Sequence, residues 1–400
     1  MDRQYDVIIA GAGPAGAGLA GQLARAGVRV ALLDKAAFPR DKACGEYTSP
    51  QTAAVLARMG ALPYVEQARP RRLPAMRVIA ANGTSFTMDY AAQGGAVLAT
   101  PRLRLDAALV AYATAGGADL HEHTRVVDVL RDGAQVVGVQ VRQGAGAVQA
   151  WRAPLIVGAD GSHSAVARAL GVTRPLRWPV RLGLVAHYSG VRGCDNWGEM
   201  HVAAHGYCGL APLTDGLVHV GIVVRLPGPD APRLSSAARF AAALAAFPTL
   251  TATMAGATQV TAVRGVGPVG VGARQPCGPG WLLVGDAAGF FDPFTGEGVY
   301  KALRGAELAA PVILAALAAG DLSARALQPY RAARRQAFFA KDLVCRVVQG
   351  FVQVPLGLNY VAPRLAHRPG QLAVMAGVLG DSMDARRALS PLYLASLLRP

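Results

Sequence analysis

Apolar and polar residues at the start of the chain follow the order strand, helix, strand. Residues 7–9 are all β-branched and predict a buried strand. A glycine-rich turn at 11–16 leads into a segment rich in Ala and Leu, which predicts a helix that Gly27 ends. The mainly apolar run at 28–33 predicts a second strand. Together these elements form a βαβ unit, half of a dinucleotide-binding fold.

The next part of the chain combines a helix with hairpins. The spacing of apolar residues after Pro101 predicts a helix that runs through Ala115. Between residues 124 and 152, valines alternate with polar residues on both sides of an Asp-Gly turn, which predicts antiparallel hairpins. The apolar run at 155–157 predicts a further buried strand.

Residues 174–264 have a different pattern, with short segments in which apolar and polar residues alternate. The clearest of these segments span 182–188, 199–204 and 217–224. They predict a mainly antiparallel sheet that forms a second domain. A second G-x-G-x-x-G pattern begins at Gly265, but no βαβ unit surrounds it, so we reject it as a dinucleotide site.

The C-terminal part is mostly helical. Residues 281–284 predict one more buried strand, and after the glycine-rich run that ends at Gly298 a long helix should extend toward Leu317. The stretch 347–363 is uncharged but contains Pro355 and polar residues, and a closing helix at 389–398 is apolar on most faces. We expect these last helices to cap the core, and an apolar entrance or a peripheral membrane contact are the alternatives.

Composition excludes several classes of protein. Hydrophobic residues make up 52% and charged residues 16% of the 400 residues, so the chain is not disordered. Two apolar segments raise the question of a membrane span, but Pro248 and polar residues interrupt 240–263, and 308–320 is too short. The N-terminus imitates a secretory signal, but cleavage there would remove the first strand and the glycine turn, so we expect a cytoplasmic protein.

Cysteine spacing and charge narrow the possible partners. The five cysteines are scattered without a C-x-x-C pair, which indicates reduced thiols and argues against a disulfide framework or a zinc site. The net charge of +15 comes mainly from arginine, because only four lysines are present. No basic stripe with interleaved aromatics is present, so we expect no nucleic-acid partner, with a general attraction for anions as the alternative.

The first glycine turn has the spacing that phosphate binding requires, and it reads Gly11-Ala12-Gly13-Pro14-Ala15-Gly16. Gly11 permits the tight turn, Gly13 lets a pyrophosphate approach the backbone, and Gly16 lets helix and strand pack closely. Free N–H groups at the start of the following helix attract the phosphates. The turn therefore predicts a dinucleotide site.

Two further glycine-rich segments follow, Gly158-Ala159-Asp160-Gly161 and the run from Gly285 to Gly298 that reads GDAAGFFDPFTGEG. With the first turn and the acid Asp34, they resemble in order and spacing an FAD-dependent group. This group contains the aromatic hydroxylases of the p-hydroxybenzoate hydroxylase type and the geranylgeranyl reductases. The resemblance covers residues 5–320. It implies non-covalent FAD, with NAD(P)H (NADH or NADPH) as a reductant that visits the same domain briefly.

By this resemblance the fold is α/β, with an FAD-binding Rossmann-like domain of the glutathione-reductase type, an antiparallel-sheet substrate domain and C-terminal helices. We assign to the FAD-binding domain residues 1–75, 100–173 and 265–345. The substrate-binding sheet domain should comprise 76–99 and 174–264, and the C-terminal helical segment 346–400.

The resemblance also implies roles around the cofactor. Asp34 should hold the adenosine ribose, and Arg102 a phosphate or the sugar chain of the flavin. Asp286 should bind ribityl or ribose hydroxyls, and Asp160 should support the nicotinamide and pyrophosphate region. The other residues expected at the cofactor, besides the glycine turn, are Lys35, Arg40, Cys44, Gly45, Gly161 and Gly285.

Three residues of the last motif, Pro293, Gly296 and Gly298, should lie beside the isoalloxazine ring by the same resemblance. Gly296 to Gly298 start the predicted long helix. Free N–H groups and the positive end of the helix dipole would therefore face the flavin and stabilise its anionic reduced form.

Candidates for catalysis are Cys44, Tyr207 and Pro293. Arg40, Lys42, Cys44 and Gly45 stand in the order R-x-K-x-C-G, which resembles a segment of geranylgeranyl reductases and related hydroxylases. In that family the cysteine lies near the flavin ring; a small buried thiol is the alternative interpretation of Cys44. Tyr207 and Pro212 match the ends of the reductases' Y-x-W-x-F-P signature, but both large aromatics are absent.

The middle of the chain holds four histidines, His187, His201, His205 and His219. They could transfer protons or orient a phenol above the flavin, and the alternative is that they are polar residues on exposed strand faces. A metal site built from His201 and His205 lacks a third ligand at a convincing spacing, so we expect no metal.

We expect an NAD(P)H-dependent monooxygenase that hydroxylates a hydrophobic aromatic, quinone or polyketide-type substrate, because the lost aromatics argue against a long isoprenoid. The Cys44-Gly45 loop favours the alternative, an ene-reductase of isoprenoid double bonds with Cys44 or Tyr207 as the proton donor. A flavin-bound electron carrier is the weaker alternative, because the chain devotes a whole domain to a pocket.

Overall fold

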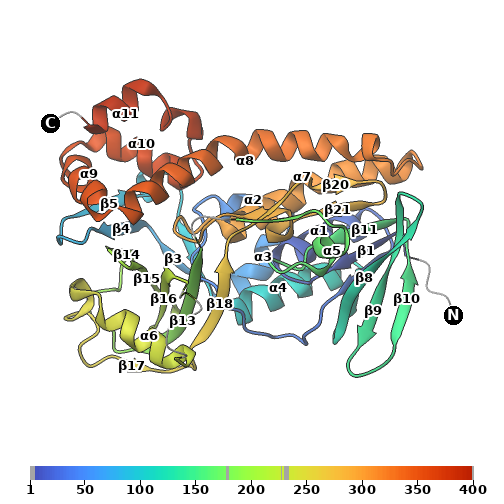
Figure 1. Cartoon of the computed structure of the whole chain (residues 1–400), viewed down its shortest axis with the longest axis horizontal. Coiled ribbons are helices and arrows are strands. Elements are labelled where there is room, and N and C mark those ends of the chain that lie inside the picture. The colour runs from blue at the N-terminus through green and yellow to red at the C-terminus, as the bar shows by residue number, and fades with distance from the viewer. Residues whose placement is uncertain (1–4, 177–179, 227, 229–233, 399–400) are drawn as a thin grey trace.

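Two sheets lie at opposite ends of the molecule, and the C-terminal helices cover the larger one (Figure 1). The computed structural model describes residues 5–176, 180–226, 228 and 234–398. Its mixture of a parallel sheet, antiparallel sheets and helices confirms the expected α/β class.

The first sheet has six strands in the order β20-β21-β11-β1-β2-β7 and is parallel except at β20. Its strands are β1 (Val7–Ala10), β2 (Val30–Leu33), β7 (Asp119–His121), β11 (Leu155–Gly158), β20 (Cys277–Gly278) and β21 (Trp281–Leu283). The predicted βαβ unit is therefore present, with α1 (Pro14–Arg25) as its helix.

Both faces of this sheet are covered, which explains why its strands are continuously apolar. Val7 and Ile9 pack with the apolar residues of α1, α4 (Arg102–Ala115) and α7 (Gly298–Ala318). Ile8 packs on the other face against the valines of a three-stranded antiparallel sheet. The strands of that sheet are β8 (Thr124–Asp132), β9 (Gln135–Gln143) and β10 (Val148–Arg152), as the predicted hairpins require.

The second sheet has eight strands, with the order β17-β13-β16-β15-β14-β4-β5 and β18 paired to β13. They are β4 (Ala75–Ile79), β5 (Ser85–Asp89), β13 (Arg181–Ser189), β14 (Gly198–Ala203), β15 (Gly206–Pro212), β16 (Leu217–Arg225), β17 (Thr258–Gln259) and β18 (Arg264–Val269). All neighbours are antiparallel except β14 and β4. The second G-x-G-x-x-G pattern forms strand β18, so rejecting it as a dinucleotide site was correct.

One face of the large sheet is closed by α6 (Ser236–Ala245), whose Phe240 packs against residues such as Leu184 and Val220. The opposite face meets the part of the molecule that holds the parallel sheet, and the C-terminal helices (Figure 1). This second face is the one that lines the cavity described below.

Four helices end the chain: α8 (Ala324–Gln353), α9 (Pro355–His367), α10 (Pro369–Leu379) and α11 (Pro391–Leu398). Their apolar residues form one core with Val78, Phe86 and Met88 of β4 and β5, as expected of a cap. Among the described helices, none combines the length and apolar character needed to cross a bilayer. A peripheral membrane contact through these helices stays a prediction.

A buried lysine joins α8 to the end of α10. Lys341 Nζ donates hydrogen bonds to the carbonyl oxygens of Val378 (2.7 Å) and Leu379 (3.0 Å) and to Asp381 Oδ1 (2.8 Å). Lys341→Met would leave Asp381 buried without its cation, so we expect the free energy of unfolding to fall by about 3–5 kcal/mol. Chemical denaturation measures this, and Arg335→Met, at an exposed position of the same helix, is the control, expected within about 0.5 kcal/mol of wild type. Equal losses in the two variants would contradict the prediction.

Candidate active site

A cavity lies where the parallel sheet, the large sheet and the start of α7 meet. Most of the residues predicted for the site line it: Gly13, Pro14, Ala15, Cys44, Gly45, Arg102, Gly161, Tyr207, Gly285, Asp286, Pro293, Gly296 and Gly298. The structure therefore brings together the three glycine-rich segments, the Cys44 loop and the large sheet.

The glycines of the first turn differ in what surrounds them. Gly11 has φ +100°, and a Cβ atom there would lie 2.5 Å from the carbonyl oxygen of Ala159. A Cβ atom on Gly16 would collide with the backbone of Gly11. A Cβ atom on Gly13 would meet only two guanidinium groups, of Arg40 at 3.7 Å and of Arg102 at 4.0 Å. Gly11 and Gly16 are thus required by packing, whereas Gly13 borders open space.

This open space has the features of a pyrophosphate site. Gly13 is the N-cap of α1 and no side chain caps the helix, so backbone N–H groups are free for an anion. Arg102 binds Asp106 through two hydrogen bonds of 2.7 Å, and Arg40 binds the same carboxylate at 2.9 Å. Although burial opposes the charged form, Asp106 and the Cys44 thiol raise the pKa of Arg102. Two arginines facing one glycine fit the pyrophosphate of FAD.

Besides Gly11, Gly16 and Arg40, three predicted cofactor residues lie outside the cavity lining: Asp34, Lys35 and Asp160. Asp34 ends β2 and accepts hydrogen bonds from the backbone N–H groups of Ala12 and Ala36, both at 2.9 Å. Lys35 is exposed. Asp160 Oδ2 accepts from Ala165 N at 2.6 Å, while its Oδ1 is buried and without a hydrogen-bond partner in the described part of the chain. Burial raises the pKa of Asp160. Their roles toward the cofactor stay predictions.

Helix α7 begins at Gly298, where the sequence predicts a helix N-terminus. Gly296 has φ +67°, and a Cβ atom there would lie 3.0 Å from the Tyr47 ring, so a side chain would be both strained and crowded. Glu297 is the N-cap residue and is buried. Burial favours its neutral form, but Lys301 and Lys341 prevail and lower its pKa. The first turn of α7 is thus positioned beside Pro293 at the cavity wall.

Tyr207 belongs to a buried polar cluster. Its hydroxyl donates to Asp292 Oδ1 at 2.6 Å, and Gln349 Nε2 donates to the same oxygen at 2.5 Å. Arg181 Nη1 lies 3.3 Å from Asp292 Oδ2. Burial and the Asp292 carboxylate raise the pKa of Tyr207 well above its ordinary value. Tyr207 therefore keeps its proton at neutral pH, donates it in a hydrogen bond to Asp292, and lines the cavity.

Cys44 is the second protic side chain among the predicted catalytic residues. It is half-buried, lies on the loop after β2 and lines the same cavity. The alternative of a small buried thiol is therefore not what the structure shows. All five cysteines are free thiols, as expected from their spacing.

Sequence reasoning missed Asp292 and Glu46. Asp292 lies inside the third glycine-rich motif, and Glu46 directly follows Cys44-Gly45, so their positions beside motifs were an available signal. Gln349 and Arg181 carried no signal, because nothing in the sequence pattern links α8 or β13 to Asp292.

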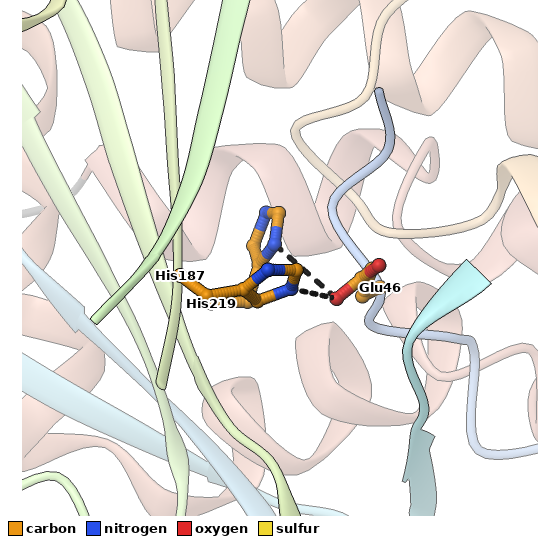
Figure 2. A group of neighbouring side chains, drawn as sticks. All are labelled: Glu46, His187 and His219. Atoms are coloured by element: carbon orange, nitrogen blue, oxygen red, sulfur yellow. Dashed lines mark hydrogen bonds and ion pairs between the residues drawn. The ribbon is translucent and has the colours of Figure 1, made fainter. Parts of the chain in front are cut away.

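Glu46 contacts two of the four histidines from the middle of the chain, His187 and His219 (Figure 2). His187 Nε2 lies 2.7 Å from Glu46 Oε2, and His219 Nδ1 lies 3.4 Å from the same oxygen. Glu46 has φ +51°, an unusual backbone conformation for a residue with a side chain, and its Oε1 accepts from Arg102 N at 2.8 Å. The carboxylate thus joins the Cys44 loop, the start of α4 and the large sheet.

The alternative interpretation, histidines on exposed strand faces, is wrong for His201 and His219, which are 3% and 2% exposed. His201 bonds Glu199 and Thr249, both at 2.9 Å, and the ring of His205 packs against Phe247. These contacts account for His201 and His205 without a metal. In the described part of the chain, the only group of three or more side chains with metal-ligand atoms close together is Glu46, His187 and His219.

The Glu46 cluster should make stability depend on pH. His187 and His219 lower the pKa of Glu46 from 4.5 to about 2 against the opposing effect of burial, so this contribution is present above pH 4.5 and is lost as pH falls toward 2. The hydrogen bond to Glu46 raises the pKa of His187 above 6.5, so its contribution is present below pH 6.5 and is lost at higher pH. Both contributions are therefore present between pH 4.5 and 6.5.

We expect Glu46→Gln to lower the free energy of unfolding by up to about 3 kcal/mol in that window, and by less on either side of it. Denaturant unfolding of wild type and variant from pH 3 to pH 9 measures the difference. The pH profile of Glu66→Gln, an exposed carboxylate, should follow that of wild type. A Glu46→Gln deficit that does not change with pH would contradict the prediction.

Comparison with known proteins agrees with this geometry. A family profile described as FAD binding domain matches residues 4–347. Menaquinone reductase of Mycolicibacterium smegmatis is 30% identical over 336 residues, which cover 78% of this chain and 77% of that protein. Digeranylgeranylglycerophospholipid reductase 2 of Methanopyrus kandleri is 31% identical over 335 residues, covering 82% and 81%. The solved structure of the myxobacterial chondrochloren halogenase CndH superposes with a TM-score of 0.78 at 27% identity, covering 85% of this chain and 82% of that one.

Proposed function

Since this chain belongs to the FAD-binding domain family and is an FAD-dependent oxidoreductase, we propose that it reduces carbon–carbon double bonds in the prenyl chain of a hydrophobic substrate. The sequence patterns alone favour a monooxygenase over a reductase, and this proposal puts the reductase first. Two of the compared relatives are reductases, and one of their names specifies a geranylgeranyl lipid.

The observation that carries the proposal is the pair of protic side chains on the cavity wall, Cys44 from the loop and Tyr207 from the sheet. When bound, FAD that NAD(P)H has reduced supplies a hydride equivalent. Reduction of an alkene also requires one proton at the second carbon, which must come from a positioned acid. Both candidate acids lie on segments that the fold holds in place, Tyr207 through Asp292 and the Cys44 loop through Glu46.

The rest of the cavity wall suits an apolar substrate. Its side chains include Met76, Met200, Val223, Val266, Val269 and Phe294. Such a wall excludes water from the reacting carbons and binds a hydrocarbon chain through burial of apolar surface. The substrate class expected from the sequence, a hydrophobic small molecule, is therefore retained in the proposal.

A monooxygenase remains the second candidate, because one observation favours it. Between Tyr207 and Pro212, Gly209 and Ala211 line the cavity in place of the two large aromatics of the reductase signature. The same apolar cavity would keep water from a reactive oxygen species. For either reaction NAD(P)H is the proposed reductant, and it would visit the FAD-binding domain.

The test is NAD(P)H oxidation by the FAD-loaded protein in the absence of air, with a panel of prenylated phenols, prenylated quinones and small aromatic acids. A reductase consumes NAD(P)H only when a prenylated compound is present and stops when that compound is exhausted. Stimulation by small charged acids alone, or consumption that requires air, would contradict the proposal.

A further inference from the structure

His219 holds an unusual position on the cavity wall. It lies on β16 with 2% of its surface exposed, and it lines the cavity. Its Nδ1 lies 3.4 Å from Glu46 Oε2, but neither Nδ1 nor Nε2 makes a hydrogen bond with any residue that the structure describes. A buried ring nitrogen without a partner is costly unless something else satisfies it. The nitrogen therefore indicates a polar ligand atom in the cavity.

The residues that neighbour His219 on β16 show where its Nε2 atom lies. Gly221 lies two residues after His219, on the same face of β16. A Cβ atom on Gly221 would lie 3.0 Å from His219 Nε2. The His219 ring therefore lies over Gly221, where a larger side chain would crowd Nε2, on the cavity side of the sheet.

The Glu46 carboxylate holds the ring in place from the other side. Its Oε1 is used by Arg102 N at 2.8 Å and its Oε2 by His187 Nε2 at 2.7 Å, and the two imidazoles stand side by side, directed toward it (Figure 2). A metal ion bound here would have to break the His187 bond. A ligand atom at His219 Nε2 requires no rearrangement of the cluster. The contacts therefore favour a hydrogen-bonding ligand over a metal ion.

Strand register relates His219 to the proposed proton donor. His219 pairs with Ala211 of β15, Gly221 pairs with Gly209, and Val223 pairs with Tyr207. His219 and Tyr207 thus occupy rows of the same face that are four residues apart, about 13 Å along the strand. The row between them carries the adjacent glycines 209 and 221, which both line the cavity, and Met200 Cε lies 3.5 Å from the Cβ position of Gly209.

We propose that His219 binds an oxygen atom on the ring of the substrate's head group, a quinone carbonyl or a phenol hydroxyl. The proposal rests on the proposed function, because it places the ring over the two glycines and the attached prenyl chain near Tyr207. With a hydrogen on Nε2 the ring donates to a carbonyl, and with that nitrogen bare it accepts from a hydroxyl. His219 is then a specificity residue, and Glu46 positions it.

Binding to the oxidised, FAD-loaded protein tests the assignment without turnover. The probes are 2-methyl-3-prenyl-1,4-naphthoquinone and 2-methyl-3-prenylnaphthalene, which share a skeleton but differ in the ring oxygens. Titration calorimetry should show that wild type prefers the quinone, and that His219→Leu weakens quinone binding by about tenfold while hydrocarbon binding changes little. His219→Gln, which keeps a hydrogen-bonding group, should retain part of the preference.

Two further variants keep the test decisive. Gly221→Val places a Cβ atom 3.0 Å from Nε2 and two methyl groups beside it, which crowd the nitrogen, so it should abolish the quinone preference although His219 is still present. His205→Leu, at a half-buried histidine outside the cavity, should leave the preference unchanged. A quinone preference that survives in both His219→Leu and Gly221→Val would overturn the assignment.

Stoichiometric zinc or iron in purified wild type, lost in His219→Leu, would also overturn the assignment in favour of a metal site. The result of this binding test is independent of whether the proposed reduction occurs. If the quinone preference depends on His219 but no double bond is ever reduced, the head-group site stands and the proposed reaction fails.

Discussion

Gly13→Glu should remove FAD from the protein without unfolding it. The new side chain would enter the space between the start of α1 and the guanidinium groups of Arg40 and Arg102. It would occupy the volume of the pyrophosphate and place a carboxylate where the phosphate charge must lie. Repulsion between the carboxylate and the phosphates, together with the lost volume, should reduce the binding free energy of FAD by several kcal/mol. We therefore expect FAD affinity to fall at least about a hundredfold.

Flavin absorbance of the purified protein and titration of the apoprotein with FAD measure this loss. Gly370→Glu is the matched control, because Gly370 is exposed at the start of α10 with nothing within 4 Å of an added Cβ atom. That variant should bind FAD as wild type does. Gly16→Ala should differ from both, since its Cβ atom collides with the backbone and should destabilise the apoprotein as well. A yellow Gly13→Glu protein with wild-type affinity would contradict the placement of FAD.

The double variant Cys44→Ala/Tyr207→Phe should slow double-bond reduction by about 10²–10⁴, because it removes both protic side chains proposed to supply the proton. Reduction of the bound flavin by NAD(P)H should continue at the wild-type rate, since that step needs neither side chain. Rapid-mixing measurements separate the two steps. Tyr207→Phe also leaves Asp292 with one hydrogen bond fewer, so we expect a loss of about 1–3 kcal/mol in stability.

A matched control variant carries the same two types of substitution, Cys to Ala and Tyr to Phe, on the opposite face of the same sheet. Cys208 follows Tyr207 on β15, and Tyr188 stacks on Phe240 beneath α6. Cys208→Ala/Tyr188→Phe should keep its reductase activity. The single variants Cys44→Ala and Tyr207→Phe then identify the proton donor. Loss of the donor should slow the oxidation of the reduced flavin by substrate and should leave the reduction of the flavin by NAD(P)H unchanged. Unchanged rates in the Cys44/Tyr207 double variant would show that the proton comes from elsewhere.

Local signals in the sequence predicted much of the fold. The helix that begins at Arg102 and ends at Ala115, the valine hairpins and the start of α7 at Gly298 all appear where the pattern indicates. These elements depend on residues close together in the chain, such as apolar spacing and glycines at turns. The resemblance to FAD-dependent enzymes added the cofactor, which the family match supports.

The histidine cluster could not be predicted in the same way. Glu46 contacts His187 across 141 positions of the chain, and the pairing of His187 with His219 depends on the register of β13 against β16. A shift of one residue would turn both histidines to the opposite face. Alternating strands also suggested one solvated face, but α6 covers one side of β16 and the cavity and Cys44 loop lie on the other. Burial of the histidines followed from this tertiary arrangement alone.

A single-turnover experiment without air tests the proposed reaction most directly. The FAD-loaded protein is reduced with NAD(P)H, mixed with one equivalent of a prenylated naphthoquinone, and the product is exposed to air before its mass is measured, so that any reduced ring returns to the quinone. We predict a product heavier by two hydrogens, both on the prenyl chain. An unchanged prenyl chain, together with a product heavier by one oxygen when the turnover is repeated in air, would contradict the reductase and establish the monooxygenase.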